Sequence, residues 1–272
     1  MFLYFLFYFL MVWLAFLPSI IWLRFFLRFD KHPEPQNSIL RTFLWGMLAA
    51  PIAMAIEPFL EYIFRYFAFS AGFVLNWSLF GFILIAPIVE EILKYGTAKI
   101  GYWEFPAEFD EPVDFMVYLI TVALGFAAIE NVVYFLGTSD KIVGIASGII
   151  WGSILLFGRF LTANLLHALT AAIIGFFIAL SWRYQSKHYI LLVFGLIVAI
   201  IVHSSYNYCV FNLNRINGVT NLVFLVKIGI LIGFLGGLLL LIIYLLKSLS
   251  NVSSICKIKS KKSKLKVRKI YG

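Results

Sequence analysis

The sequence predicts an all-α fold, a polytopic transmembrane helical bundle of about seven to eight spans. Hydrophobic residues make up 62% of the 272 residues and charged residues only 13%, whereas a soluble protein has about 25% charged residues. The mean hydropathy is +0.96. Because backbone polar groups in lipid must pair within their own segment, we expect each long apolar stretch to be a helix.

The expected spans are separated by loops too short to fold alone. One further segment, 142–158, is apolar and glycine-rich, and it could be an eighth span, a re-entrant turn or a surface helix. If it does not cross, the first basic loop and the basic C-terminus lie on the same side, as the positive-inside rule favours. We therefore favour seven spans, with the N-terminus outside and the C-terminus in the cytoplasm. The seven ranges are 2–25, 39–58, 74–98, 114–136, 159–181, 189–210 and 221–246.

The charged residues are segregated along the chain. All 13 acidic residues lie at or before Asp140, and nine lysines or arginines without any acid follow from Lys247 onward. We expect a membrane domain over 1–246 and a basic, disordered, cytoplasmic tail over 247–272. Such a tail attracts anionic lipid. Nucleic-acid binding is not expected, because no folded domain accompanies the tail.

Two adjacent glutamates lie inside the third expected span. Glu90, Glu91 and Lys94 fall within one helical turn of an apolar stretch, although each charge costs roughly 2.5–3.5 kcal/mol at the centre of a membrane. Lys94 can reach either carboxylate at these spacings. Neighbouring helix positions point about 100° apart, so one glutamate can face a cavity while the other holds a partner helix. The group is either a structural ion pair or the acid–base machinery of a hydrolase.

A third acid occurs in the next span, in the pattern Phe126-x-x-x-Glu130-Asn131. Phe126 and Glu130 share a helix face at this spacing. A lone acid inside a membrane is by default a functional residue, here a metal ligand or a proton-relay group. Gly125 and the two alanines after Phe126 are small residues, which allow neighbouring helices to approach closely.

Two histidines lie in later spans. His167 could serve only as an interhelical hydrogen-bond partner, or it could bind a metal. His203 precedes Asn207 by four residues, so imidazole and amide share one face. The imidazole can bind a metal, and the amide can donate to a developing oxyanion. Two histidines and a glutamate form the ligand set of many hydrolytic zinc sites.

These motifs, in this order, resemble the PrsW family of intramembrane metalloproteases. The pattern is E-E-x-x-K at 90–94, F-x-x-x-E-N at 126–131, the span histidine His167, and H-x-x-x-N at 203–207. The acidic, proline-containing loop Asp30–Pro35 is also similar to that family. The related CAAX prenyl endopeptidase and bacteriocin-processing group has E-E-x-x-x-R and F-x-x-x-H instead, which counts against a prenyl-protein substrate.

The resemblance implies a metal-dependent endopeptidase that cleaves a membrane-anchored protein, as PrsW cleaves an anti-sigma factor. It implies a zinc ion as cofactor and a multi-pass protein of the cell membrane. Two alternatives remain open: a proton-coupled transporter, and a non-catalytic membrane scaffold or immunity protein that keeps the fold. The implied roles are activation of water by Glu90 or Glu91, metal ligation by Glu130, His167 and His203, stabilisation of the tetrahedral intermediate by Asn207, and support by Lys94, Phe126 and Asn131.

Overall fold

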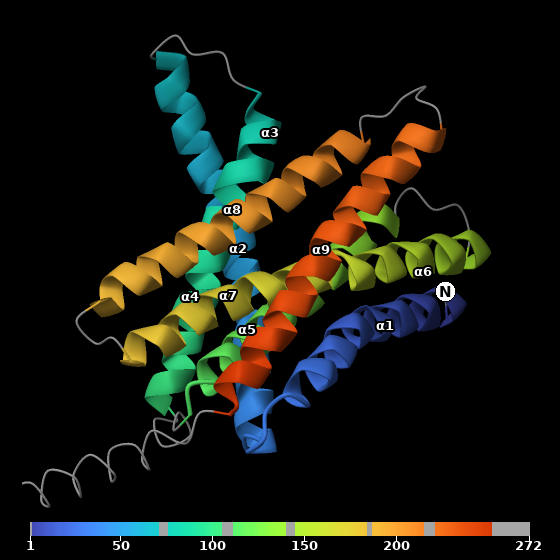
Figure 1. Ribbon diagram of the computed structural model, residues 1–272. Helices are drawn as coiled ribbons and strands as arrows, with labels where there is room; N and C mark the ends of the chain where they lie inside the picture. Colours follow the sequence, from blue (N-terminus) through green and yellow to red (C-terminus); the bar gives the residue numbers. More distant parts are fainter. Residues whose placement is uncertain are drawn as a thin grey trace, which may run out of the picture.

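The computed structural model describes residues 2–70, 76–104, 111–139, 145–183, 187–214 and 221–251, and these residues form helices joined by short loops. Figure 1 shows the helices as a bundle without a sheet in the described part of the chain. The all-α prediction is confirmed. In chain order the elements are α1 (Phe2–Leu27), α2 (Gln36–Ser70), α3 (Trp77–Phe80), the π-helix η1 (Gly81–Ile85), α4 (Ala86–Glu104), α5 (Asp114–Ser139), α6 (Ile145–Leu161), α7 (Ala163–Arg183), α8 (His188–Asn214) and α9 (Asn221–Leu249).

Six segments of the described chain are long and apolar enough to cross a membrane. The stretch α3–η1–α4 is not among them, and it carries the charged residues Glu90, Glu91 and Lys94. Adding this stretch gives seven crossings, in agreement with the lower predicted number. The protein is therefore a multi-pass membrane protein.

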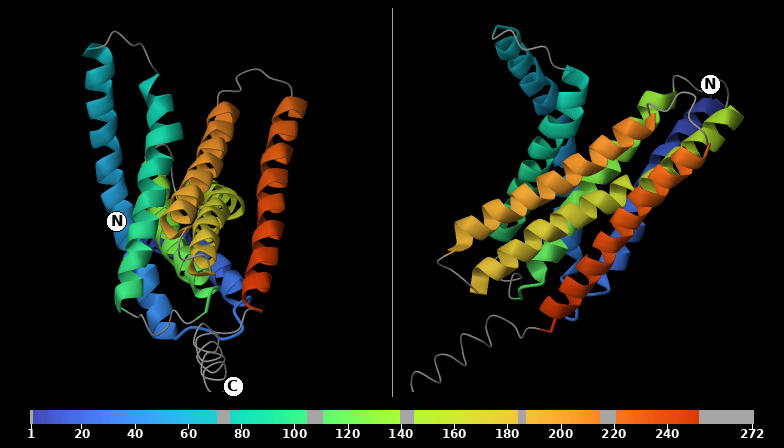
Figure 2. Two further views of the ribbon diagram at one scale, coloured as in Figure 1. Left: turned by 60° about the vertical axis from the view of Figure 1, so that its left-hand side comes forward. Right: turned by 45° about the horizontal axis from the view of Figure 1, so that its top comes forward.

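Helix α2 is longer than the predicted span 39–58, because it continues to Ser70 past Pro51 and Pro58. A proline removes one hydrogen bond and kinks a helix, but it need not end it. The C-terminal half of α2 extends together with α3 beyond the neighbouring helices (Figures 1 and 2).

The ambiguous segment 142–158 falls mostly in α6, which a turn at Thr162 joins to α7. The apolar stretch Ile150–Ser181 runs through both helices and counts as one candidate span. The loop after α1 and the end of α9 lie at the same end of the bundle, because the Lys31 ammonium donates to the Asn251 side chain. This is the arrangement that seven crossings require. Residues 252–272 of the tail lie outside the described residues.

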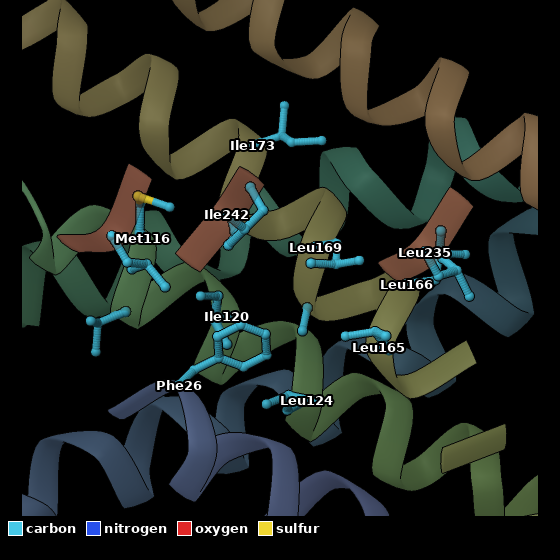
Figure 3. Close-up of a cluster of buried hydrophobic side chains, with 14 of the residues drawn as sticks. Phe26, Met116, Ile120, Leu124, Leu165, Leu166, Leu169, Ile173, Leu235 and Ile242 are labelled. Carbon is cyan, nitrogen blue, oxygen red and sulfur yellow. The ribbon is translucent and has the colours of Figure 1, made fainter. Parts of the chain in front are cut away.

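Helices α5 and α7 form the centre of the bundle. Helix α5 packs against α1, α2 and α7, and α7 packs in turn against α8. Buried side chains of α1, α2, α5, α7, α8 and α9 form an apolar cluster, which Figure 3 shows around Ile120, Leu124, Leu166 and Leu169. The close approach expected at Gly125 is confirmed, because a Cβ atom there would overlap with the backbone carbonyl of Phe43 in α2. This packing fixes the inward faces of α5 and α7, which carry Glu130 and His167.

Candidate functional site

The ionisable residues identified in the spans come together in one buried group. Their side chains extend from four helices into the interior of the bundle, and none of these residues is more than 9% exposed. The separate pieces noted in the sequence therefore belong to a single site. Its members are Glu90, Glu91 and Lys94 from α4, Glu130 from α5, His167 from α7 and His203 from α8.

The side chains of the two adjacent glutamates point in different directions, as helical geometry predicts. Lys94 Nζ lies 3.3 Å from Glu90 Oε2 and 2.9 Å from Glu91 Oε1. Glu91 is fully buried and faces the partner helices, where its Oε1 accepts a 3.1 Å hydrogen bond from Thr170 Oγ1. Glu90 instead lines the main cavity of the site. Of the two, Glu90 is the carboxylate that faces the cavity.

Each imidazole is held by one carboxylate and turns its other nitrogen toward Glu90. His167 Nε2 lies 2.6 Å from Glu130 Oε2, and His203 Nδ1 lies 2.8 Å from Glu91 Oε1. The opposite nitrogens, His167 Nδ1 and His203 Nε2, lie 3.7 Å and 3.9 Å from Glu90 Oε2. A carboxylate on the far nitrogen is the usual means of orienting a metal-binding histidine.

The donor set fits a zinc ion in type and spacing. Glu90, Glu91, His167 and His203 each offer one ligand atom, and these four atoms lie within 4.8 Å of one another. Ligand atoms of a tetrahedral zinc site stand about 3.3 Å apart, so the separations between Glu90 and the imidazoles need to contract by only about half an ångström. Glu91 Oε2 is also buried without a hydrogen-bond partner in the described part of the chain.

An ammonium group lies among the same donor atoms. Lys94 Nζ is 2.7 Å from His167 Nδ1, besides its contacts with the two glutamates. Lys94 also stands over the ring of Phe126, 4.9 Å from its centroid, as a cation–π pair. Lys94 therefore contacts both glutamates, His167 and the Phe126 ring, which places a positive charge among the carboxylates of the group.

Asn131 connects the site to three other helices. Its Oδ1 accepts a 2.6 Å hydrogen bond from Arg159 Nε, and its Nδ2 donates to Ala15 O and Asn164 Oδ1. The same Arg159 pairs through Nη2 with Glu130 Oε2 at 3.1 Å. Asn131 thus ties α5 to α1, α6 and α7.

Asn207 is held by an irregular turn at the start of the third span. Its Nδ2 donates a 2.7 Å hydrogen bond to the carbonyl of Phe82 in η1. In a π-helix the partner of this carbonyl would be residue 87, but Pro87 has no N–H. The Ala86 N–H pairs with Gly81. The carbonyl is therefore left for Asn207, which is buried and lines the cavity.

A cavity of about 670 Å³ opens onto the site. This volume is typical of a ligand-binding pocket. Apolar residues of α6, α8 and α9 form much of its wall, among them Leu155, Val210 and Leu231. Its polar lining includes Glu57, Glu90, Glu130, Arg159, His167, His203 and Asn207.

Two residues of this lining were not identified from the sequence. Arg159 is the first residue of the expected span 159–181, a position at the membrane boundary where a basic residue is common. Glu57 is an acid within an apolar span, so the argument that identified Glu130 applies to it equally. His188, in contrast, lies away from the group and contacts Ser181.

Comparisons with known proteins agree with the motif resemblance. The profile described as "PrsW family intramembrane metalloprotease" matches residues 34–246. The chain is 31% identical to Protease PrsW of Geobacillus kaustophilus (strain HTA426) over 153 residues, which are 56% of this chain and 58% of that protein. It is 29% identical to Protease PrsW of Bacillus subtilis (strain 168), over 70% of this chain and 78% of that protein. No solved structure matches significantly.

Proposed function

Because the chain belongs to the PrsW family of intramembrane metalloproteases, which makes it a peptide hydrolase of the membrane, we propose that it is an endopeptidase that cleaves membrane-anchored proteins at the cavity beside Glu90. The observation that supports this site most directly is the convergence of Glu90 with two oriented imidazoles at the wall of that cavity. A transporter would not require this arrangement, and membership of a protease family argues against that alternative.

We propose that His167, His203 and Glu90 hold a zinc ion, with Glu130 and Glu91 orienting the two imidazoles. This division differs from the one implied by the resemblance, in which Glu130 is a ligand. The support for it is that Glu130 Oε2 contacts His167 Nε2, whereas the nitrogen of His167 that faces Glu90 is Nδ1. When bound, zinc would supply a Lewis acid that makes water easier to ionise and polarises a carbonyl.

The protein groups supply the proton transfer. All contacts of Glu90 with Lys94 and the imidazoles in the described chain use Oε2, so Oε1 is available to a water in the cavity. Glu90 would accept a proton as this water adds to the peptide carbonyl carbon, and would return it to the amine nitrogen as the C–N bond breaks. The products are a carboxylic acid and an amine.

Asn207 would stabilise the tetrahedral intermediate. Its side-chain amide has two N–H groups, and one of them is used by Phe82 O. The other can donate to the oxyanion that forms on the substrate carbonyl. The hydrogen bond to Phe82 holds the amide in place before the substrate arrives.

The substrate is proposed to be a protein with a single membrane anchor, of the anti-sigma-factor class. The apolar residues of the cavity wall would contact a peptide segment that enters from the bilayer. The polar residues around Glu90 would contact its scissile bond. The cleavage would release the soluble part of such a regulator.

The test is cleavage of a co-expressed tagged substrate by variants of the site. Glu90→Gln, His167→Gln and His203→Gln should each abolish cleavage while the protein remains folded in the membrane. Matched controls are Glu61→Gln, another acid in an apolar span, and His188→Gln at the start of α8, and both should cleave normally. Cleavage retained in all three site variants would end this proposal.

We further propose that the basic segment from Lys247 onward lies in the cytoplasm and binds anionic lipid. The support is its charge, together with the contact between Lys31 and Asn251, which places the first basic loop at the same end of the bundle. Labelling of single cysteines with an impermeant reagent in intact cells would test it. Labelling of a cysteine at position 251 from outside the cell would show that the C-terminus is not cytoplasmic, and would contradict this proposal.

A further inference from the structure

A second group of carboxylates lies far from the site described above. Asp30 and Glu34 follow α1, and Glu111 and Asp114 precede or begin α5. We call these four residues the loop acidic cluster. Asp114 is 16 residues before Glu130 on α5, about 24 Å along the helix, so the two groups share no ligand.

Three of the carboxylates are close enough to share an ion. Asp30, Glu34 and Asp114 each offer one oxygen, and these three oxygens lie within 4.8 Å of one another. Glu111 is adjacent, because its backbone N–H donates to Asp114 Oδ2 at 2.6 Å. Like charges at this separation repel strongly when they are shielded from water.

Three of the four carboxylates are buried and Glu34 is half-buried, and part of the cluster's hydrogen-bonding capacity is unused. Asp114 is 1% exposed and Glu111 is 4% exposed. Asp114 Oδ1 and Glu111 Oε2 have no hydrogen-bond partner in the described part of the chain. Such oxygens carry a cost of about 1–3 kcal/mol each unless a further group satisfies them. The unused oxygens therefore point to a ligand with positive charge.

We propose that the loop acidic cluster binds a calcium ion that fastens the α1–α2 loop to the start of α5. All the donors are carboxylate oxygens, which hard cations prefer. Calcium accepts several carboxylates and irregular geometry, whereas magnesium usually binds one or two carboxylates and keeps its water. The cluster contains neither cysteine nor an inward imidazole. His32 contacts Glu111 Oε1 at 2.9 Å from the exposed side.

The remaining contacts show how the site is positioned. Tyr118 donates a 3.0 Å hydrogen bond to Glu34 Oε2, and the His32 backbone N–H donates to Asp30 Oδ1 at 3.0 Å. These bonds help to hold the two loop carboxylates close to Asp114. The loop and α5 thus present preoriented ligands from two segments that are far apart in the sequence.

The experiment uses the full-length protein in a non-ionic detergent, with calcium chloride or magnesium chloride added alone after chelator treatment. Saturable calcium binding should raise Tm by about 5 °C at a concentration well above Kd. Magnesium should give a smaller shift at equal concentration. An equal response to magnesium would overturn the assignment to calcium, and no saturable response to either ion at millimolar concentration would overturn the site.

Three variants locate the effect. Asp114→Asn keeps an acceptor for the Glu111 N–H but removes a charge, so it should abolish the calcium-dependent rise in Tm and should raise Tm in chelator. Glu61→Gln and His203→Gln should keep the calcium shift of the parent protein. A calcium shift that survives in Asp114→Asn but disappears in His203→Gln would place the ion in the other site and overturn the proposal.

Discussion

Lys94 Nζ lies 2.7 Å from His167 Nδ1 in the interior of the bundle. An ammonium can only donate, so Nδ1 of a neutral imidazole must be the acceptor. The ring proton then belongs on Nε2, which faces Glu130 Oε2 at 2.6 Å. The lone pair of Nδ1 therefore points toward the Lys94 ammonium, which lies between this imidazole and the two glutamates of α4. A metal bound there would face the same donors and would be repelled by the ammonium.

Replacing Lys94 by methionine should strengthen zinc binding. A zinc ion of charge +2 and an ammonium about 4 Å apart repel by roughly 8 kcal/mol at an effective dielectric of 20, and the loss of a partner for Glu90 and Glu91 offsets only part of this. We expect at least a tenfold decrease in Kd, measured by competition with a chelator of known affinity. Lys99→Met, at an exposed position on the same helix, is the control. Weaker binding in Lys94→Met would show that the ammonium supports the donors instead.

Replacing Glu130 by glutamine tests whether this carboxylate orients His167 or binds the metal itself. Loss of an orienting carboxylate typically lowers metal affinity by about 10–100-fold, and Glu90→Gln should lower it further because a ligand is lost. Zinc content after dialysis against graded chelator gives both values, with Glu61→Gln as the unaffected reference. If Glu130→Gln were the more damaging of the two, Glu130 would be the ligand, as the sequence motif implied.

Much of the site could be predicted from the sequence because charge is costly in an apolar span. Glu90, Glu130, His167 and His203 each stand out against their neighbours for this reason. Helical spacing also placed Phe126 on the face of Glu130, and placed Lys94 within reach of both glutamates. These are local properties of single helices, so they can be inferred from the sequence alone.

The parts that were not predicted depend on how helices pack. Arg159 reaches Glu130 only because α6 lies beside α5 before the turn at Thr162, and hydropathy carries no information on that contact. The hydrogen bond between Asn207 and Phe82 depends on a π-helical turn, which Pro87 favours but does not specify. The full length of α2 was not predicted, because the expected span 39–58 ends at Pro58 whereas the helix continues to Ser70.

Replacing Asn207 by alanine should lower kcat by about 10²–10³-fold with little change in KM, because an oxyanion donor acts mainly in the transition state. The measurement is steady-state cleavage of a fluorogenic peptide in detergent. Asn212→Ala, just over one turn later on α8, removes an amide that donates to Tyr208 O, and it should leave both constants unchanged. A change in KM alone would assign Asn207 to substrate binding.

Replacing Gly125 by alanine should destabilise the crossing of α2 and α5. A Cβ atom at Gly125 would overlap with the carbonyl of Phe43, and backbone cannot move aside as a flexible side chain can. Overpacking of this kind costs about 1–3 kcal/mol, so the midpoint of unfolding in detergent should fall. Gly137→Ala lies on the same helix, where nothing stands within 4 Å of the added atom, and it should be neutral or slightly stabilising. Because α5 also carries Glu130, Gly125→Ala should reduce zinc retention as well as stability. Unchanged stability would mean that the two helices can separate without cost, and that their close contact does not hold the site.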